Sequence, residues 1–456
     1  MSRPVVPTGS APDIAPGRLT AAAIERNFAD LHPPLSKSEA LIAADRCYFC
    51  FAAPCTAACP TAIDIPRFIQ SIRSGDIEGA AYAILAENIM GGMCARVCPT
   101  EVLCEEACVR NVHEEKPVDI GLLQRHATDP IIDAGTQLFP RAASSGKRVA
   151  VVGGGPAALS CAHRLAWLGH EITIFSRDGK LGGLNEYGIA AYKTVDDFAQ
   201  REVAYILGIG GIEVRAGNAL GRDLSLAKLC REFDAVFLAV GLAGVNRLGL
   251  ESEDLPGVLD AVRYIAELRQ APDKSQLPVG RRVVVIGGGM TAIDVAVQCK
   301  RLGADDVTIV YRRGKEQMGA SRFEQDLARS GGVRIKDWAR PVRLVGKGFV
   351  TRVEFETTRE GADRRLEGTG ETFAMNADVV FKAIGQEIAW NELGAASAIL
   401  READGRIAVD ANRKTSLDNV WAGGDCAAGG KDLTVTAVQD GKLAAKAIDE
   451  YLKSGG

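Results

Sequence analysis

The chain has 456 residues, about three times the length of a typical domain, so two or three domains can each bury a core. Hydrophobic residues make up 47% of the chain and charged residues 25%, which is typical of a folded protein and not of a disordered one. The 54 basic and 58 acidic residues leave a net charge of -4 without a long basic run, which argues against a nucleic-acid partner.

Residues 1–145 are expected to form a helical domain. Apolar residues recur at three- and four-residue spacing in three stretches, at 36–46, 66–88 and 117–135, which predicts amphipathic helices. The N-terminal sequence MSRPVVPTGSAPDIAPGRL has no apolar signal-peptide core, and no run approaches the ~18 apolar residues of a membrane span. We therefore expect a cytoplasmic protein with no membrane partner.

Eight of the twelve cysteines lie between Cys47 and Cys108, in the patterns CxxCxxxxCxxxCP and CxxxCPxxxxCxxxC. Disulfides are not expected in a cytoplasmic chain. Zinc is an alternative, because paired cysteines also form tetrahedral zinc sites. Three closely spaced cysteines followed by Cys-Pro resemble the iron–sulfur run of two-cluster ferredoxins. The pattern therefore favours two [4Fe-4S] clusters over zinc.

After a small-residue stretch at 135–147, short β-branched runs alternate with helical or glycine-rich segments. This alternation predicts parallel sheets covered by helices. One segment occurs twice, as RVAVVGGGPAALSCAHRLAWLGHEITIFSR at 148–177 and RVVVIGGGMTAIDVAVQCKRLGADDVTIVYRR at 282–313. Each copy has a strand, a glycine turn, a helix and a second strand. We therefore predict two Rossmann-like nucleotide-binding domains.

In the first copy, Gly153 permits the tight turn and Gly155 lets the backbone approach a pyrophosphate, while Ala158 packs the helix on the strand. The amides of the helix start, at Pro156 and Ala157, are expected to face the phosphates. The acid that usually holds the ribose is absent, because Ser176 occupies its position.

Two later segments support a flavin at the first site. The segment LGGLNEYGI contains Gly182, Gly183 and Leu184. The segment NVWAGGDCA resembles the C-terminal flavin motif of two-dinucleotide-binding flavoproteins. That resemblance implies that Gly424 and Asp425 contact FAD, with Asp425 bonding the ribityl chain, and that a helix beginning at Thr434 points its amides at the flavin.

In the second copy, Gly287, Gly289 and Ala292 take the same geometric positions, and Met290 and Thr291 begin the helix. The second strand is followed by Arg312 and Arg313 instead of an acid. Arginine at this position accommodates the 2′-phosphate of NADPH, although a solvated basic turn is the alternative. NADPH is favoured over NADH without excluding it. A further strand-and-glycine segment contributes Ala383, Ile384 and Gly385.

The order of these motifs resembles one family along nearly the whole chain: the small subunit of bacterial glutamate synthase and the N-terminal half of dihydropyrimidine dehydrogenase. The resemblance implies a helical domain with two [4Fe-4S] clusters at 1–145, an FAD-binding domain at 146–278 and 386–456, and an NAD(P)H-binding domain at 279–385. It assigns Cys47, Cys50, Cys55 and Cys108 to one cluster and Cys59, Cys98, Cys104 and Gln124 to the other.

The resemblance leaves Cys94 without a ligand role, and Gly319 stands where animal dihydropyrimidine dehydrogenases have Arg. Glutamate synthase small subunits tend to carry Glu at the position of Gln124. Gln124 and the segment GLNEYGIAAYK therefore favour the electron-input subunit of a bacterial dihydropyrimidine dehydrogenase.

The resemblance also implies a partner. No FMN-binding barrel follows residue 456, so we expect the pyrimidine site on an FMN and iron–sulfur subunit, in a heterotetramer. A glutamate synthase small subunit and a free-standing NAD(P)H:ferredoxin-type oxidoreductase are the alternatives. Because the cofactors carry the chemistry, no catalytic acid–base pair is expected.

Overall fold

The computed structural model describes residues 13–394 and 399–455. Residues 1–12, part of the stretch without a signal-peptide core, lie outside the described residues. The chain forms two compact units. One contains the described residues up to Leu31 together with Tyr187–Val195 and Val245–Gln386. The other contains His32–Glu186, Asp196–Gly244 and the described residues from Glu387 onward.

The second unit begins with the helical, cysteine-containing region. Helix α2 starts with a capping box, in which Ser36 and Glu39 each bond the backbone amide of the other. Gly75, at φ 82°, ends α4, and Asp76 caps α5. The helices are α2 (Lys37–Asp45), α3 (Pro54–Ala58), α4 (Ile65–Ser74), α5 (Ile77–Leu85), α6 (Gly91–Val97), α7 (Val109–Glu114) and α8 (Ile120–Ala134), with the turn η1 (Thr100–Val102).

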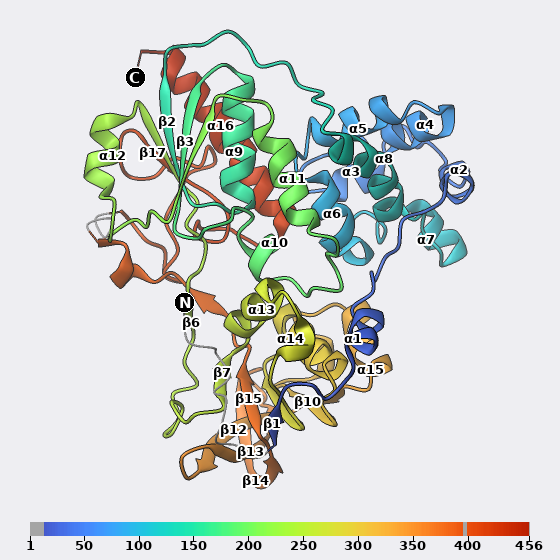
Figure 1. Ribbon diagram of the computed structural model, residues 1–456, viewed down its shortest axis with the longest axis vertical. Helices are drawn as coiled ribbons and strands as arrows, with labels where there is room; N and C mark the ends of the chain where they lie inside the picture. Colours follow the sequence, from blue (N-terminus) through green and yellow to red (C-terminus); the bar gives the residue numbers. More distant parts are fainter. Residues whose placement is uncertain (1–12, 395–398, 456) are drawn as a thin grey trace. The chain divides into compact units, whose positions relative to one another are not determined.

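The same unit contains a five-stranded parallel sheet in the order β17-β5-β2-β3-β4. The strands are β2 (Arg148–Val152), β3 (Glu171–Ser176), β4 (Ile212–Ala216), β5 (Ala235–Leu238) and β17 (Val420–Ala422). Helices α9 (Pro156–Trp167) and α16 (Thr434–Lys453) pack together on one side, and α12 (Leu226–Glu232) lies on the other (Figure 1). The remaining elements are α10 (Leu184–Tyr187), α11 (Phe198–Leu207) and η4 (Trp390–Glu392).

The first unit is built on a second parallel sheet, in the order β11-β10-β9-β15-β7. Its strands are β7 (Val258–Asp260), β9 (Arg282–Ile286), β10 (Asp306–Val310), β11 (Arg334–Lys336) and β15 (Val379–Lys382). Helices α13 (Ala261–Gln270), α14 (Met290–Arg301) and α15 (Arg322–Ser330) accompany it, with η2 (Lys274–Gln276) and η3 (Lys315–Gln317). An antiparallel sheet of β12 (Ala339–Gly346), β13 (Val350–Glu360) and β14 (Leu366–Asn376) completes the unit.

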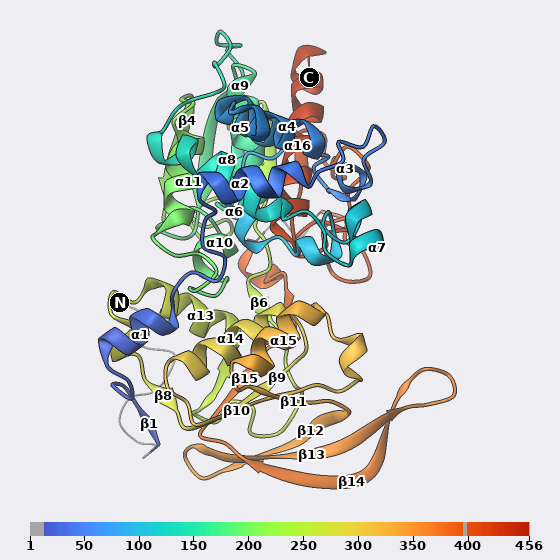
Figure 2. The same cartoon turned by 90° about the vertical axis from the view of Figure 1, so that its right-hand side faces the viewer.

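Strand β9 is buried on both faces, as expected of a parallel sheet with two covered sides. Val283 and Val285 belong to the core shared with α13 and α14, whereas Val284 and Ile286 belong to the core under β12–β14. Figure 2 shows α13, α14 and α15 on one side of this sheet and the β12–β14 ribbon on the other. The two glycine-containing repeats thus occupy two separate Rossmann-like sheets.

The N-terminal residues group with the second nucleotide-binding repeat and not with the cysteine region. Strand β1 (Ile14–Ala15) pairs with β8 (Val279–Gly280), and Asn27, the last residue of α1 (Ala21–Asn27), donates to the Arg301 carbonyl over 2.8 Å. Strand β7 also joins this unit, because it pairs with β15. The domain boundaries at 145, 278 and 385 stay a prediction. The chain passes between the units at β6 (Gly244–Val245) and β16 (Gln386–Glu387).

Among the described residues, no helix has both the length and the apolar character needed to cross a membrane.

Candidate cofactor sites

The first nucleotide site lies at the carboxyl ends of β2 and β3. Gly153 has φ 121°, and a Cβ at this position would collide with the Ala239 carbonyl oxygen. The Gly182 amide donates to the Gly154 carbonyl over 2.7 Å, and a Cβ on Gly183 would lie 2.7 Å from the Gly155 Cα. The glycines therefore bring the loop that continues into Leu184 directly against the first turn, as the predicted site requires.

The C-terminal flavin motif reaches the same edge of the sheet. Gly424 has φ 75°, and its Cβ would lie 3.0 Å from the Cβ of Ala157, at the start of α9 beside Pro156. The Gly424 amide donates to the buried carboxylate of Asp440 over 2.9 Å. Burial raises the pKa of the neighbouring Asp425 to about 6. These contacts form a cradle of close backbone approaches, which fits a dinucleotide.

Thr434 and Ser176 make specific contacts at this site. Thr434 begins α16 and donates its hydroxyl to Asn185 over 2.7 Å, while no side chain caps the helix amides. The free amides fit an electron-rich ligand atom. Ser176 ends β3 beside Gly154, and its hydroxyl accepts the Asp178 amide over 3.3 Å.

The second site repeats this geometry on the other sheet. Gly287 has φ 144°, and a Cβ on it would collide with the Ala383 carbonyl oxygen, whereas the space around Gly289 is open. The helix α14 begins directly after Gly289, with Met290 and Thr291. A Cβ on Gly319 would lie 3.8 Å from the Gly289 Cα. The turn has room for a pyrophosphate.

The strand-and-glycine segment Ala383–Gly385 and two arginines also belong to the predicted second site. Asn246 donates to the Ile384 carbonyl over 3.2 Å, and Gly385 follows with φ 93°. Arg312 is exposed and Arg313 is half-buried. Both follow β10, at the carboxyl edge of this sheet.

The first four predicted cysteine ligands lie together. Burial raises the pKa of Cys55 to about 11, and the neighbouring thiols of Cys108 and Cys47 raise it further. Burial also raises the pKa of Cys47, with smaller contributions from Cys50 and Cys108. Among the described residues, no three His, Cys, Asp or Glu side chains are placed to hold a single metal ion.

The second predicted set lines one small cavity. Cys59, Cys98, Cys104 and Gln124 all face it, together with Val435, the second residue of α16. Cys94 lines the same cavity, which the cysteine spacing did not indicate. Burial raises the pKa of Cys98 well above that of an ordinary thiol, and the thiols of Cys94, Cys104 and Cys59 add to the shift. The cavity is thus lined by four cysteines and by the amide side chains of Gln124 and Asn88.

The orientation of the Gln124 amide follows from its hydrogen bond. Its nitrogen donates to the Gly91 carbonyl over 2.6 Å, and a carbonyl accepts only from the NH₂ side of the amide. The oxygen is therefore the remaining donor atom of the Gln124 amide. Three thiols and an amide around a common space fit the donor set of an iron–sulfur cluster.

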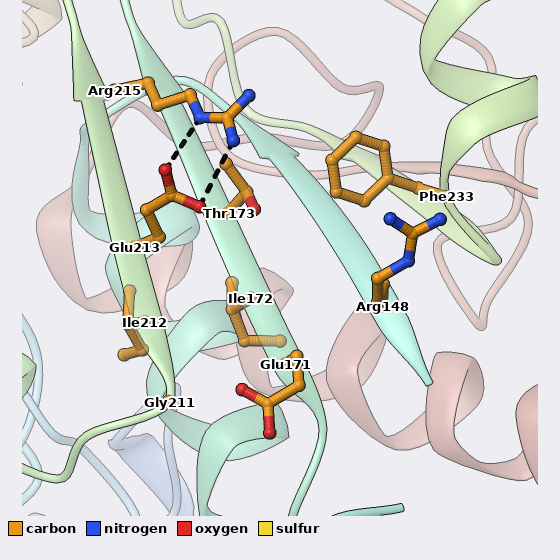
Figure 3. Close-up of a pocket in the computed structure, with 9 residues that line it drawn as sticks. All are labelled: Arg148, Glu171, Ile172, Thr173, Gly211, Ile212, Glu213, Arg215 and Phe233. Atoms are coloured by element: carbon orange, nitrogen blue, oxygen red, sulfur yellow. Dashed lines mark hydrogen bonds and ion pairs between the residues drawn. The ribbon is translucent and has the colours of Figure 1, made fainter. Parts of the chain in front are cut away.

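A further pocket lies at the amino ends of β2, β3 and β4, away from the glycine turns (Figure 3). Arg215 and Glu213 of β4 form an ion pair there over 2.9 Å, so their charges satisfy each other. The lining residues are Arg148, Glu171, Ile172, Thr173, Gly211, Ile212, Glu213, Arg215 and Phe233. We assign no cofactor to this pocket.

Two family models match the chain. Residues 147–441 match the pyridine nucleotide-disulphide oxidoreductase family, and residues 24–136 match the dihydropyrimidine dehydrogenase domain II, 4Fe-4S cluster. These matches assign FAD and NAD(P)H to the Rossmann-like part of the chain and a 4Fe-4S cluster to the cysteine region.

The chain also resembles curated proteins over most of its length. The glutamate synthase [NADPH] small chain of Escherichia coli is 35% identical over 449 residues, which cover 93% of this chain and 94% of that protein. The NAD-dependent dihydropyrimidine dehydrogenase subunit PreT of Salmonella typhimurium is 34% identical over 430 residues, covering 94% of this chain and 98% of that protein.

Solved structures share the fold. Mycobacterium tuberculosis FprA in complex with NADPH has a TM-score of 0.57 at 19% identity, covering 68% of this chain and 85% of FprA. The thioredoxin reductase of T. acidophilum has a TM-score of 0.52 at 22% identity, covering 68% of this chain and all of that chain. At this identity the likeness concerns the fold alone.

Proposed function

The chain belongs to the pyridine nucleotide-disulphide oxidoreductase family, and from this premise we propose that it is the electron-input subunit of a dihydropyrimidine dehydrogenase. It is an NAD(P)-dependent oxidoreductase with the N-terminal iron–sulfur domain of dihydropyrimidine dehydrogenase. When bound, FAD converts the two-electron chemistry of NAD(P)H into single electrons, which iron–sulfur clusters carry. The proposed partner uses these electrons to reduce uracil or thymine.

We assign the nucleotide-binding residues from the two glycine turns and the segments packed against them. No side chain of the chain is assigned an acid–base role, because its task is to hold and orient cofactors. The proposed FAD residues are Gly153, Gly155, Pro156, Ala157, Ser176, Gly182, Gly183, Leu184, Gly424, Asp425 and Thr434. The proposed NAD(P)H residues are Gly287, Gly289, Met290, Thr291, Arg312, Arg313, Ala383, Ile384 and Gly385.

Two cysteine-rich sets are proposed to hold two [4Fe-4S] clusters within a domain at 1–145. The thiols of Cys47 and Cys108 raise the pKa of Cys55, which supports the first set. This set also includes Cys50, whose thiol raises the pKa of Cys47. The shared cavity supports the second set, which consists of Cys59, Cys98, Cys104 and Gln124.

The pyrimidine assignment depends on one observation: Gln124 lines the cavity of the second predicted cluster set. Its side chain lines the cavity with the amide nitrogen bonded to the Gly91 carbonyl, and a neutral amide leaves a cluster less anionic than a carboxylate or thiolate would. We expect Gln124→Cys to change the reduction potential and electron paramagnetic resonance spectrum of one cluster, leaving the other cluster and the flavin unchanged. Identical spectra and potentials in parent and variant would contradict the ligand assignment and favour the glutamate synthase function.

The proposed partner is an FMN and iron–sulfur subunit that carries the pyrimidine site, in a heterotetramer. The relative PreT is itself described as a subunit, which supports a partner of this kind. We also propose a cytoplasmic location. All twelve cysteines are free in the structure, which fits a reducing compartment.

The function is tested by purifying the tagged chain from its native cells under anaerobic conditions, together with the subunit bound to it. The complex is assayed for uracil and thymine reduction with NADH and with NADPH. In parallel, it is assayed for glutamate formation from glutamine and 2-oxoglutarate. We expect pyrimidine reduction and bound FMN. Glutamate formation without pyrimidine reduction would overturn the proposal.

A glutamate synthase small subunit is the second candidate, since the E. coli protein of that name is 35% identical over most of both chains. A free-standing NAD(P)H:ferredoxin-type oxidoreductase is the third. It predicts reduction of a soluble ferredoxin by the purified chain without any bound subunit.

A further inference from the structure

A buried hydroxyl group lies beside one predicted cluster ligand. The turn after Cys59 is closed by the Ala62 amide, which donates to the Cys59 carbonyl over 2.9 Å, and Ala62 has φ 57°. Thr61 lies inside this turn and is completely buried. Its hydroxyl oxygen is 3.3 Å from the Cys59 sulfur. The turn therefore holds the hydroxyl against the sulfur.

A lysine from a distant part of the chain anchors the same turn. The ammonium group of Lys442 donates to the Thr61 carbonyl over 2.8 Å and to the Glu87 carboxylate over 2.8 Å. Lys442 lies on α16, the helix that begins at Thr434 in the proposed flavin site. One helix thus spans from the flavin site to the turn that carries Cys59.

A ligating cysteine is a thiolate and has no proton to donate, so the hydroxyl must be the donor when a cluster is bound. Hydrogen bonds to cluster sulfurs and nearby positive charge stabilise the reduced, more negative state of the cluster. We propose that Thr61 donates a hydrogen bond to the Cys59 thiolate and raises the reduction potential of the second cluster, with Lys442 as the residue that positions Thr61.

This inference rests on the proposed function, because it requires the second cluster. Thr61→Val removes the hydroxyl at nearly constant volume, and Thr61→Ser retains it. Potentials are measured by anaerobic redox titration of the reconstituted full chain, with each cluster followed by its electron paramagnetic resonance signal. We expect Thr61→Val to lower the potential of one cluster, and Thr61→Ser to remain near the parent value.

Thr415→Val is the matched control, because the Thr415 hydroxyl is also buried and bonded, donating to the Val420 carbonyl over 2.9 Å. It should leave both cluster potentials unchanged. Unchanged potentials in Thr61→Val, with both clusters present, would overturn the inference alone. A parent protein without two clusters would instead overturn the proposed function.

Lys442→Met tests the positioning role, because it removes the ammonium group that holds the Thr61 carbonyl and leaves the Thr61 side chain in place. We expect it to lower the potential of the same cluster, whereas Lys446→Met, which removes an exposed charge one turn further along α16, should not. If the Thr61→Val protein assembles only one cluster, the cluster potentials of Thr61→Ala and Thr61→Ser are compared instead, because only Ser retains the hydroxyl. Equal potentials in that pair, together with an unshifted Lys442→Met, would reject the role.

Discussion

Cys94 and Gln124 line the same cavity, yet we assign only Gln124 as a ligand. Cys94 is buried, and burial raises the pKa of its thiol as it raises the pKa of the assigned ligands Cys98 and Cys104. The pKa shifts therefore do not separate Cys94 from the assigned ligands, and the assignment of Gln124 follows the family resemblance. Iron content tests this assignment.

We expect Cys94→Ser to retain full iron content and Cys98→Ser to lose one cluster. The reason is that Cys98 belongs to the proposed second set, whereas Cys94 does not. Anaerobic iron and sulfide analysis of the reconstituted full chain, at about eight irons in the parent, provides the measurement. Equal loss of iron in both variants would show that the ligand assignment is wrong. A parent protein that contains zinc instead of iron would contradict the assignment of both clusters.

Arg312 and Arg313 determine the predicted preference for NADPH. Replacing both by Gln should raise the KM for NADPH more than that for NADH, since charged hydrogen bonds to a 2′-phosphate contribute about 1.5 kcal/mol or more, roughly tenfold. Steady-state oxidation of each nucleotide with ferricyanide measures the difference. Arg329→Gln, on α15 in an exposed pair with Asp326, is the control. An equal change for both nucleotides would identify the arginines as a solvated turn.

At the scale of elements, Glu202 joins α11 to α6 within one unit. Its completely buried carboxylate accepts the Met93 amide over 3.0 Å. Burial raises the pKa of Glu202 to about 8, although the hydrogen bond from Met93 and the charge of Arg96 oppose the shift. The folded protein therefore keeps a proton on Glu202 at pH values where the unfolded chain has lost it.

This difference in protonation predicts a pH dependence of stability. Between the ordinary Glu pKa of 4.5 and about 8, the unfolded state binds fewer protons, so stability falls as the pH rises. Relative to Glu202→Gln, the parent should lose on the order of 4 kcal/mol across this window. Thermal unfolding of both proteins from pH 5 to 9 measures the difference. Glu450→Gln, at an exposed position on α16, should parallel the parent, and a parallel profile for Glu202→Gln would contradict the prediction.

The helices were largely predictable from local sequence. The apolar spacing at 36–46 corresponds to α2, whose start is set by the Ser36 and Glu39 capping box. The spacing at 66–88 suggested continuous helix, but Gly75 in the left-handed conformation divides it into α4 and α5. Pro130, by contrast, lies inside α8 without ending it.

At the scale of the whole molecule, we assign to the described chain sites for nucleotides and clusters, and no site for a pyrimidine. The purified chain alone should therefore oxidise NAD(P)H with ferricyanide or a dye and leave uracil unchanged. Spectrophotometric nucleotide oxidation and chromatographic detection of dihydrouracil measure the two activities. Uracil reduction by the isolated chain would refute the proposed division of labour between subunits.

The sequence by itself determined the helical iron–sulfur region, the two Rossmann-like repeats and the family. Each of these depends on local patterns: cysteine spacing, glycine turns and short β-branched runs. Local rules also place Gly153 and Gly287, because the tight strand-to-helix turn requires a positive φ at both positions.

Only the tertiary structure decided which distant residues meet. Thr61 and Lys442 are 381 positions apart, and Gly424 and Asp440 come together across the turn between β17 and α16. Strand β1 joins the unit of the second repeat by pairing with β8, which lies more than 260 residues later in the chain. No local pattern encodes such pairs, since they depend on how buried surfaces fit together. For the same reason, the sequence did not predict that Cys94 and Gln124 line one cavity. They lie on different helices, α6 and α8, which meet only in the folded chain.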